Sequence, residues 1–164
     1  MSTKKITTIG ILVALALILS YVEAQIPAFV AVPGMKLGLT NVVVLVALYM
    51  LGSGSAMIIN FVRIMIVAIL FGNGMSLFFS MAGGMLSTVV MILMKKTGKF
   101  SCVGVSATGG LTHNIGQILV AVFLMNTYAV SWYLPVLWMS GVFSGIVIGV
   151  IGGLVLKKLI VSIS

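Results

Sequence analysis

Acidic side chains are almost absent from this sequence. Its 164 residues contain a single acid, Glu23, and no aspartate, against nine lysines and arginines. Charged residues of both signs make up 6% of the chain, whereas a soluble domain carries about 25%. Because paired carboxylates and acidic Mg²⁺ sites need several acids, the chain cannot supply such chemistry itself. We therefore expect it not to be an enzyme.

Cysteine and histidine occur once each. Cys102 has no second cysteine for an internal disulfide, and His113 has no second histidine or cysteine with which to hold zinc. We expect no metal and no other cofactor. The net charge of +8 is found in many nucleic-acid-binding proteins, but here the basic residues lie in pairs at the ends of hydrophobic segments. We interpret them as signals of membrane topology and expect no nucleic-acid partner.

Hydrophobic residues make up 62% of the chain and form long runs without charge. A helix of roughly 20 apolar residues crosses the hydrocarbon of a bilayer, and none of the runs alternates as a strand would. The sequence predicts an all-α, polytopic membrane protein with one transmembrane domain over residues 1–164. The six predicted transmembrane helices are Ile6–Ala24, Leu37–Leu51, Ser55–Phe71, Met75–Met94, Val103–Met125 and Trp132–Leu156.

The distribution of lysine predicts the orientation. With six crossings, seven lysines fall on the side of the two termini and Lys36 on the opposite side. Cytoplasmic loops carry the excess of lysine and arginine, so we expect both termini in the cytoplasm. A cleaved signal peptide is the less favoured alternative for the first segment, because its apolar run is long and more spans follow. The seven lysines are Lys4, Lys5, Lys95, Lys96, Lys99, Lys157 and Lys158.

Small residues recur at four-residue spacing in the first and last predicted helices. Helices associate in membranes through small residues that let their backbones approach. Each stripe has two interpretations. The commoner one is packing within the bundle, and the other is docking to another subunit. The first helix carries Ala16, Ser20 and Ala24, and the last carries Gly141, Gly145, Gly149 and Gly153.

Arg63 is the ionisable residue at the greatest predicted depth. It lies near the middle of the third helix, and Asn60 precedes it by three residues on the same face. A charge there costs at least about 2.5 kcal/mol on insertion scales. We expect Glu23 to lie at the outer end of the first helix, out of reach of Arg63. Arg63 would then be neutralised by one of four alternatives: helix carbonyls, water, a lipid phosphate or an anionic ligand.

Three hydrogen-bonding side chains lie within one turn of the fifth predicted helix, namely His113, Asn114 and Gln117. A lone histidine most often has a structural role. Exposing three hydrogen-bonding side chains to lipid, however, costs too much free energy, so we expect them to face the interior of the bundle. The cluster predicts either a cavity wall or a buried polar contact.

The apolar segment from Gln25 to Lys36 contains two prolines that interrupt a helix. We expect this segment to fold over the bundle as a lid, with Asn41 just inside the second predicted helix.

Several of these segments resemble motifs of the bacterial Gx transporter family, whose members are often labelled heptaprenyl diphosphate synthase component I. The resemblance runs nearly from end to end of the chain, although Thr40 replaces the small residue expected there. It implies a location in the bacterial cytoplasmic membrane. The matching segments are Val32–Asn41, the helix that contains Arg63, Ser80–Gly84 and His113–Gln117.

The family is in turn similar in size and helix number to the substrate-binding S components of energy-coupling factor (ECF) transporters. This likeness implies an S-component-like bundle with a vitamin-like ligand under an outer loop. It also implies that the stripe on the first helix docks to a scaffold subunit that is coupled to ATPases, with Ser20 in place of the usual alanine. A similar fold alone does not establish a shared function, so these implications are expectations.

The resulting hypothesis is a substrate-binding membrane subunit for a small anionic or amphiphilic molecule, either vitamin-like or related to isoprenoids or quinones. Its expected partners are membrane lipids and ECF-type scaffold and ATPase subunits. One alternative is a non-catalytic membrane subunit in isoprenoid or quinone biosynthesis or in extracellular electron transfer, with a soluble prenyl synthase or redox partner. Another is a purely structural bundle. The predicted substrate-binding residues are Lys36, Asn41, Asn60, Arg63, His113, Asn114 and Gln117.

Overall fold

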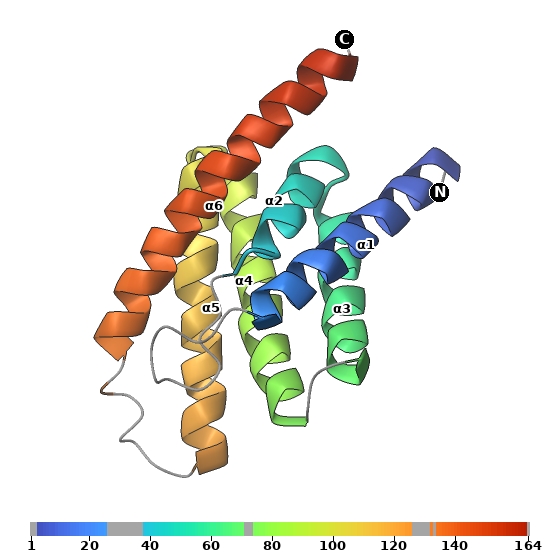
Figure 1. Cartoon of the computed structure of the whole chain (residues 1–164). Helices are drawn as coiled ribbons and strands as arrows, with labels where there is room; N and C mark the ends of the chain where they lie inside the picture. The colour runs from blue at the N-terminus through green and yellow to red at the C-terminus, as the bar shows by residue number, and fades with distance from the viewer. Residues whose placement is uncertain (1–2, 26–37, 71–73, 126–131, 133, 164) are drawn as a thin grey trace.

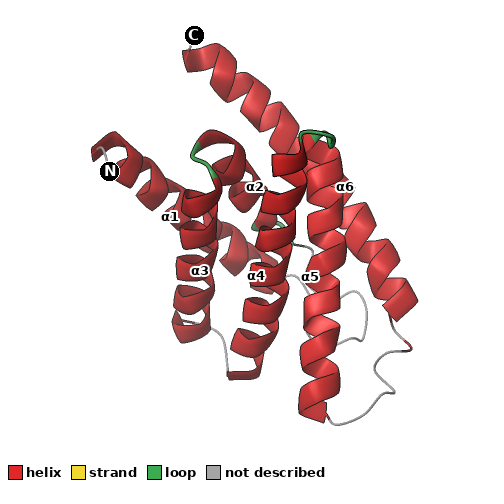
Figure 2. Ribbon diagram, turned by 180° about the vertical axis from the view of Figure 1, so that it is seen from behind, coloured by secondary structure: helices red, strands yellow, loops and turns green. Residues whose placement is uncertain are grey.

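The chain is described here from a computed structural model, which covers residues 3–25, 38–70, 74–125, 132 and 134–163. These residues form six helices and no strand, which confirms the all-α prediction. Helices α3, α4 and α5 lie side by side in one layer, and α1, α2 and α6 cover one face of it (Figures 1 and 2). The helices are α1 (Thr3–Gln25), α2 (Asn41–Met50), α3 (Ser53–Leu70), α4 (Gly74–Thr97), α5 (Cys102–Met125) and α6 (Leu134–Ile163).

Five of the described helices are long and apolar enough to cross a membrane, and α2 is not. It has 10 residues and is therefore about 15 Å long, half of a hydrocarbon layer about 30 Å thick. Gly38 and Gly52 flank it with φ angles of 76° and 89°, in the left-handed region where a right-handed helix cannot continue. The predicted six crossings are thus corrected to five long helices and one short one.

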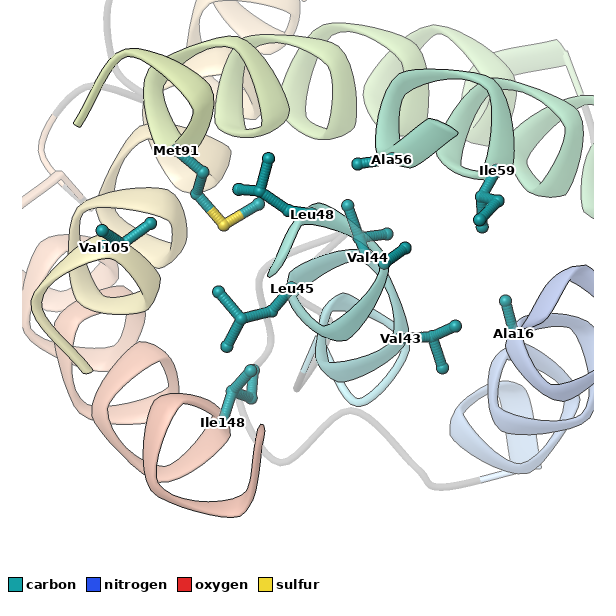
Figure 3. Packing of buried hydrophobic residues seen from close by; sticks show 11 residues of the cluster. Ala16, Val43, Val44, Leu45, Leu48, Ala56, Ile59, Met91, Val105 and Ile148 are labelled. Carbon is teal, nitrogen blue, oxygen red and sulfur yellow. The ribbon is translucent and has the colours of Figure 1, made fainter. Parts of the chain in front are cut away.

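Helix α2 forms the centre of the hydrophobic core. Every side chain from Val43 to Leu48 is buried, as expected of a helix that is apolar on all sides. In Figure 3, Val43 lies on the side of Ala16, Leu45 on the side of Ile148 and Leu48 on the side of Met91. The core cluster consists of Ala16, Val43, Val44, Leu45, Ala47, Leu48, Ala56, Ile59, Met91, Val105 and Ile148.

A lysine from α4 binds the C-terminal end of α2. The Nζ atom of Lys95 donates a 2.7 Å hydrogen bond to the carbonyl oxygen of Leu48 and lies 4.7 Å from the centre of the Tyr49 ring. The last carbonyls of a helix carry partial negative charge, and an aromatic face attracts a cation. Lys95 therefore fixes the short core helix to α4.

Replacing Lys95 with methionine is expected to lower the free energy of unfolding by about 1 to 2 kcal/mol, because both the helix-end contact and the cation–π contact are lost. Denaturant unfolding of the purified protein, followed by circular dichroism, measures the change. Lys96→Met is the matched control, since Lys96 is the exposed neighbour on the same helix. Equal effects of the two substitutions would contradict the role given to Lys95.

The glycine stripe of α6 packs against α5. A Cβ atom on Gly141 would lie 2.7 Å from the carbonyl oxygen of Gly110, and one on Gly149 would lie 2.7 Å from the Cα atom of Val103. Gly145 meets α5 equally closely at Ala107, whereas Gly153 has nothing within 4 Å. The interpretation as packing within the bundle is therefore confirmed for the stripe as far as Gly149.

The small-residue stripe of α1 also faces inward. Ala16 has an exposed fraction of 0% and Ser20 of 8%, while Ala24 is exposed. Ala16 belongs to the core cluster with residues of α2 and α3, and the Ser20 hydroxyl lies 2.9 Å from that of Thr40. The expectation that Ala16 and Ser20 dock to another subunit is corrected accordingly, because their small size lets α1 approach α2 and α3 instead.

The lysines predicted to be cytoplasmic gather at one end of the bundle. The start of α1, the connection between α4 and α5, and the end of α6 all lie at this end (Figure 1). The pattern matches the grouping used for the topology prediction. The cytoplasmic location of this end stays a prediction.

Candidate functional site

Asn60 and Arg63 are buried between α3 and α4. The Asn60 amide donates hydrogen bonds to the carbonyl oxygen of Gly84, at 2.9 Å, and to the hydroxyl of Thr88, at 2.8 Å. Thr88 in turn donates to the same Gly84 carbonyl at 2.8 Å. The Arg63 guanidinium donates to the Asn60 side-chain oxygen. We call these four residues the Asn60–Arg63 site.

Glycine at position 84 makes this contact between the helices possible. A Cβ atom there would lie 2.8 Å from the end of the Ile64 side chain and 3.2 Å from the Asn60 amide nitrogen. The missing side chain lets α3 approach α4 until Asn60 reaches the Gly84 carbonyl, which already accepts the Thr88 hydroxyl. Asn60 is thereby held in one orientation, with its oxygen toward Arg63.

Arg63 retains unused hydrogen-bonding capacity. Its exposed fraction is 9%, and its Nε atom has no hydrogen-bond partner in the described part of the chain. A guanidinium carries five N–H donors in a fixed planar fork that matches a carboxylate or a phosphate. Because a buried, unpaired donor is costly, the site favours an additional acceptor, and an anion is the acceptor that suits Arg63 best.

Glu23 is buried at the end of α1, with an exposed fraction of 8%. One of its carboxylate oxygens accepts a hydrogen bond from the backbone N–H of Gly38, and the other lies 3.5 Å from the Thr40 hydroxyl. Glu23 is thus bound to the residues that precede α2, and the expectation that it lies out of reach of Arg63 stays a prediction.

The predicted polar cluster of α5 is divided between two interfaces. His113, Asn114 and Gln117 are all buried. His113 and Gln117 pack against α4 at Gly83, whose added Cβ would lie 2.8 Å from the His113 carbonyl oxygen and 3.0 Å from the Gln117 Cγ atom. Asn114 instead points to α6, where it donates to the Leu137 carbonyl oxygen. The three buried residues thus take part in contacts between helices, which is the buried polar contact that the sequence analysis gives as the alternative to a cavity wall.

Two further residues of the predicted site are Asn41 and Lys36. Asn41 is the first residue of α2, and its amide nitrogen would be 3.1 Å from a Cβ atom on Gly38. Residues 26–36 of the predicted lid, Lys36 among them, lie outside the described residues. Of the predicted substrate-binding residues, the structure thus joins Asn60 with Arg63 and assigns Asn114 to a contact between helices.

The family is established by sequence comparison. Residues 12–155 match the family model described as heptaprenyl diphosphate synthase component I. The chain belongs to this family. No curated protein and no solved structure matches it. The matched region contains Glu23 and all four residues of the Asn60–Arg63 site. The family description names one component of a synthase, which implies partner subunits, and the five long apolar helices indicate a membrane protein.

Sequence reasoning missed two members of the site. Thr88 and Gly84 contribute a hydroxyl and a carbonyl to Asn60. A signal was present, because Gly84 and Thr88 are four residues apart on one face of the fourth predicted helix. It could not be recognised without knowing that this face meets Asn60 of the third helix.

Proposed function

We propose that this protein binds a small anionic amphiphile, with the anionic group of the guest at the Asn60–Arg63 site. The observation that carries the proposal is the buried Arg63, whose Nε–H is unpartnered in the described part of the chain. A guest would bind through the Nε–H edge of the guanidinium, while another of its nitrogens donates to the Asn60 side chain.

The chemistry of the surroundings narrows the class of guest. Apolar helices enclose the site, so a guest with a hydrocarbon tail gains from burial there. A phosphate or carboxylate head can accept two parallel hydrogen bonds from one guanidinium. A prenyl diphosphate combines both features, and the family description names that class of molecule. We take it as the favoured guest.

We further propose that the protein acts as a substrate-binding subunit in the manner of ECF S components. The chain has no aspartate and no glycine-rich phosphate loop that ends in Gly-Lys-Ser or Gly-Lys-Thr, so we assign ATP hydrolysis to partner subunits. Docking through α1 would then use its exposed face, where Gly10 has nothing within 4 Å, because Ala16 and Ser20 are buried.

A second candidate is favoured by the family description itself. As a component of a prenyl diphosphate synthase, the protein would hold the lipid-soluble substrate or product in the membrane while a soluble subunit performs the chemistry. It would be non-catalytic, since prenyl transfer by aspartate-rich Mg²⁺ sites needs acids that this chain lacks. The Asn60–Arg63 site would bind the same class of guest in both roles.

Purification from bacterial membranes in mild detergent tests the proposal. Mass spectrometry of the organic extract is expected to find an anionic amphiphile retained in stoichiometric amount, and mass spectrometry of the proteins distinguishes the two roles. A scaffold with ATPases supports transport, and a prenyl synthase supports the second candidate. A chain that retains neither an anionic molecule nor any such partner would be a structural bundle, and the proposal would fail.

A further inference from the structure

Three buried polar side chains meet where the end of α1 lies beside the start of α2 (Figure 1). The Glu23 carboxylate accepts hydrogen bonds from the backbone N–H of Gly38 and, at 3.5 Å, from the Thr40 hydroxyl. The Thr40 hydroxyl also lies 2.9 Å from the Ser20 hydroxyl. A carboxylate and two hydroxyls are thus linked in one row. We call Ser20, Glu23 and Thr40 the Glu23 cluster.

The two hydroxyls can serve either protonation state of Glu23, because a hydroxyl both donates and accepts and rotates to suit its neighbours. When Glu23 is charged, Thr40 donates to the carboxylate and Ser20 donates to Thr40. When Glu23 carries a proton, its O–H group can donate to Thr40, which then donates to Ser20. Ser20 can in turn donate to a backbone carbonyl one turn earlier in its helix. Each hydroxyl therefore has a partner in both states.

The titratable side chains on the neighbouring helices have contacts of their own. α1 packs against α2 and α3, which carry one such side chain each, Tyr49 and Arg63. Tyr49 lies near the C-terminal end of α2 beside Lys95, and Arg63 donates to Asn60. The donors to Glu23 are a backbone N–H and a hydroxyl, so within the described residues a proton on Glu23 breaks no hydrogen bond to a cation. The other titratable side chains of α1 are Lys4, Lys5 and Tyr21.

We propose that Glu23 is a proton-binding site and that the bound proton weakens the contact between α1 and the start of α2. The proton comes from water and binds the carboxylate oxygen that faces Thr40, where it forms an O–H bond and removes the negative charge. The N–H of Gly38 then donates to a neutral acceptor, and a hydrogen bond to a charged group is about twice as strong. This inference does not depend on the guest proposed for Arg63.

Infrared spectroscopy of the full chain in phosphatidylcholine nanodiscs measures proton binding without a substitution. Glu23 is the only acidic side chain in the sequence, so ¹³C-labelled glutamate gives one assignable carboxylate band. The pH is lowered from about 9 to about 4, across the range in which carboxyl and imidazole groups titrate. A carboxylic acid band is expected to replace the carboxylate band reversibly, while the helical circular dichroism stays constant. A carboxylate band that persists, or that disappears only as the helices unfold, would overturn the proposal.

Hydrogen exchange at the Gly38 amide measures the effect of the proton on the contact. Glu23→Gln keeps an acceptor for Gly38 and a donor for Thr40 without the charge, so it imitates the protonated state. The two proteins are compared at equal pH, which cancels the intrinsic pH dependence of exchange. Above the infrared transition, Gly38 is expected to exchange about 10-fold more slowly in the unaltered protein, because its hydrogen bond is charge-assisted, and below the transition the rates converge. Equal rates on both sides would overturn the effect of the proton on the contact.

Thr40→Val tests whether the hydroxyls take part in proton binding. Valine has nearly the same shape as threonine but cannot accept a hydrogen bond from a protonated Glu23. The carboxylic acid band is therefore expected to move to higher wavenumber in this variant. Thr7→Val is the matched control, since the Thr7 hydroxyl is exposed and donates to a carbonyl of its own helix. The same band position in both variants would overturn the role of Thr40 as acceptor.

Discussion

Replacing Gly110 with alanine is expected to disrupt the packing of α5 against α6 and to lower the free energy of unfolding by about 3 kcal/mol or more. The new Cβ atom would lie 2.1 Å from the carbonyl oxygen of Gly141. This oxygen belongs to the backbone, so no side-chain rotation relieves the overlap and the helices have to separate. Helix separation also removes the hydrogen bond from Asn114 to the Leu137 carbonyl.

Gly153→Ala is the matched control on α6. Nothing lies within 4 Å of a Cβ atom at this position, and alanine favours a helix over glycine by up to about 1 kcal/mol. Thermal unfolding in detergent, followed by helical circular dichroism, is expected to show a large loss for Gly110→Ala and no loss for Gly153→Ala. Similar melting temperatures of the two variants would contradict the glycine-mediated contact between α5 and α6.

Replacing Arg63 with glutamine is expected to weaken binding of a prenyl diphosphate about 100-fold, because the loss of a charge-assisted, two-pronged contact in a buried site costs roughly 3 kcal/mol. Arg63→Lys is expected to restore only part of the affinity, since an ammonium cannot supply the planar fork. Titration with geranyl diphosphate in nanodiscs measures both affinities.

The stability of the empty Arg63→Gln protein distinguishes binding from structure. The substitution removes a buried charge whose desolvation costs free energy, and glutamine can still donate to Asn60. We therefore expect an unfolding temperature near that of the unaltered protein. A variant that unfolds many degrees lower and still binds the probe normally would make Arg63 a structural residue.

The helical architecture could be predicted from the sequence because each long apolar run can satisfy its backbone in a membrane only as a helix. The depth of Asn60 and Arg63 followed from their position within one such run, and both are buried. The close packing of the glycine stripe of α6 could also be predicted, since its four-residue spacing allows a close contact with another helix. The identity of that helix could not be predicted.

The length of α2 and the position of Glu23 could not be predicted in the same way. Hydropathy counts apolar residues but does not locate the left-handed backbone at Gly38 and Gly52, which limits α2 to ten residues. The contact between Glu23 and the start of α2 joins residues from two helices, so it depends on the packing of α1. The burial of the cluster on α5 could be predicted from its three polar groups, but the helices that it contacts could not, because Asn114 donates to α6 while His113 and Gln117 lie at Gly83 of α4.

Photolabelling with a geranyl diphosphate that carries a diazirine on its tail tests the central claim most directly. After irradiation in nanodiscs, the account predicts labelled residues of α3 and α4 around Arg63, and it predicts that unlabelled geranyl diphosphate removes the label. Label confined to lipid-facing residues such as Phe123 and Phe143, which are 85% and 72% exposed, and insensitive to competition would contradict a guest held by Arg63.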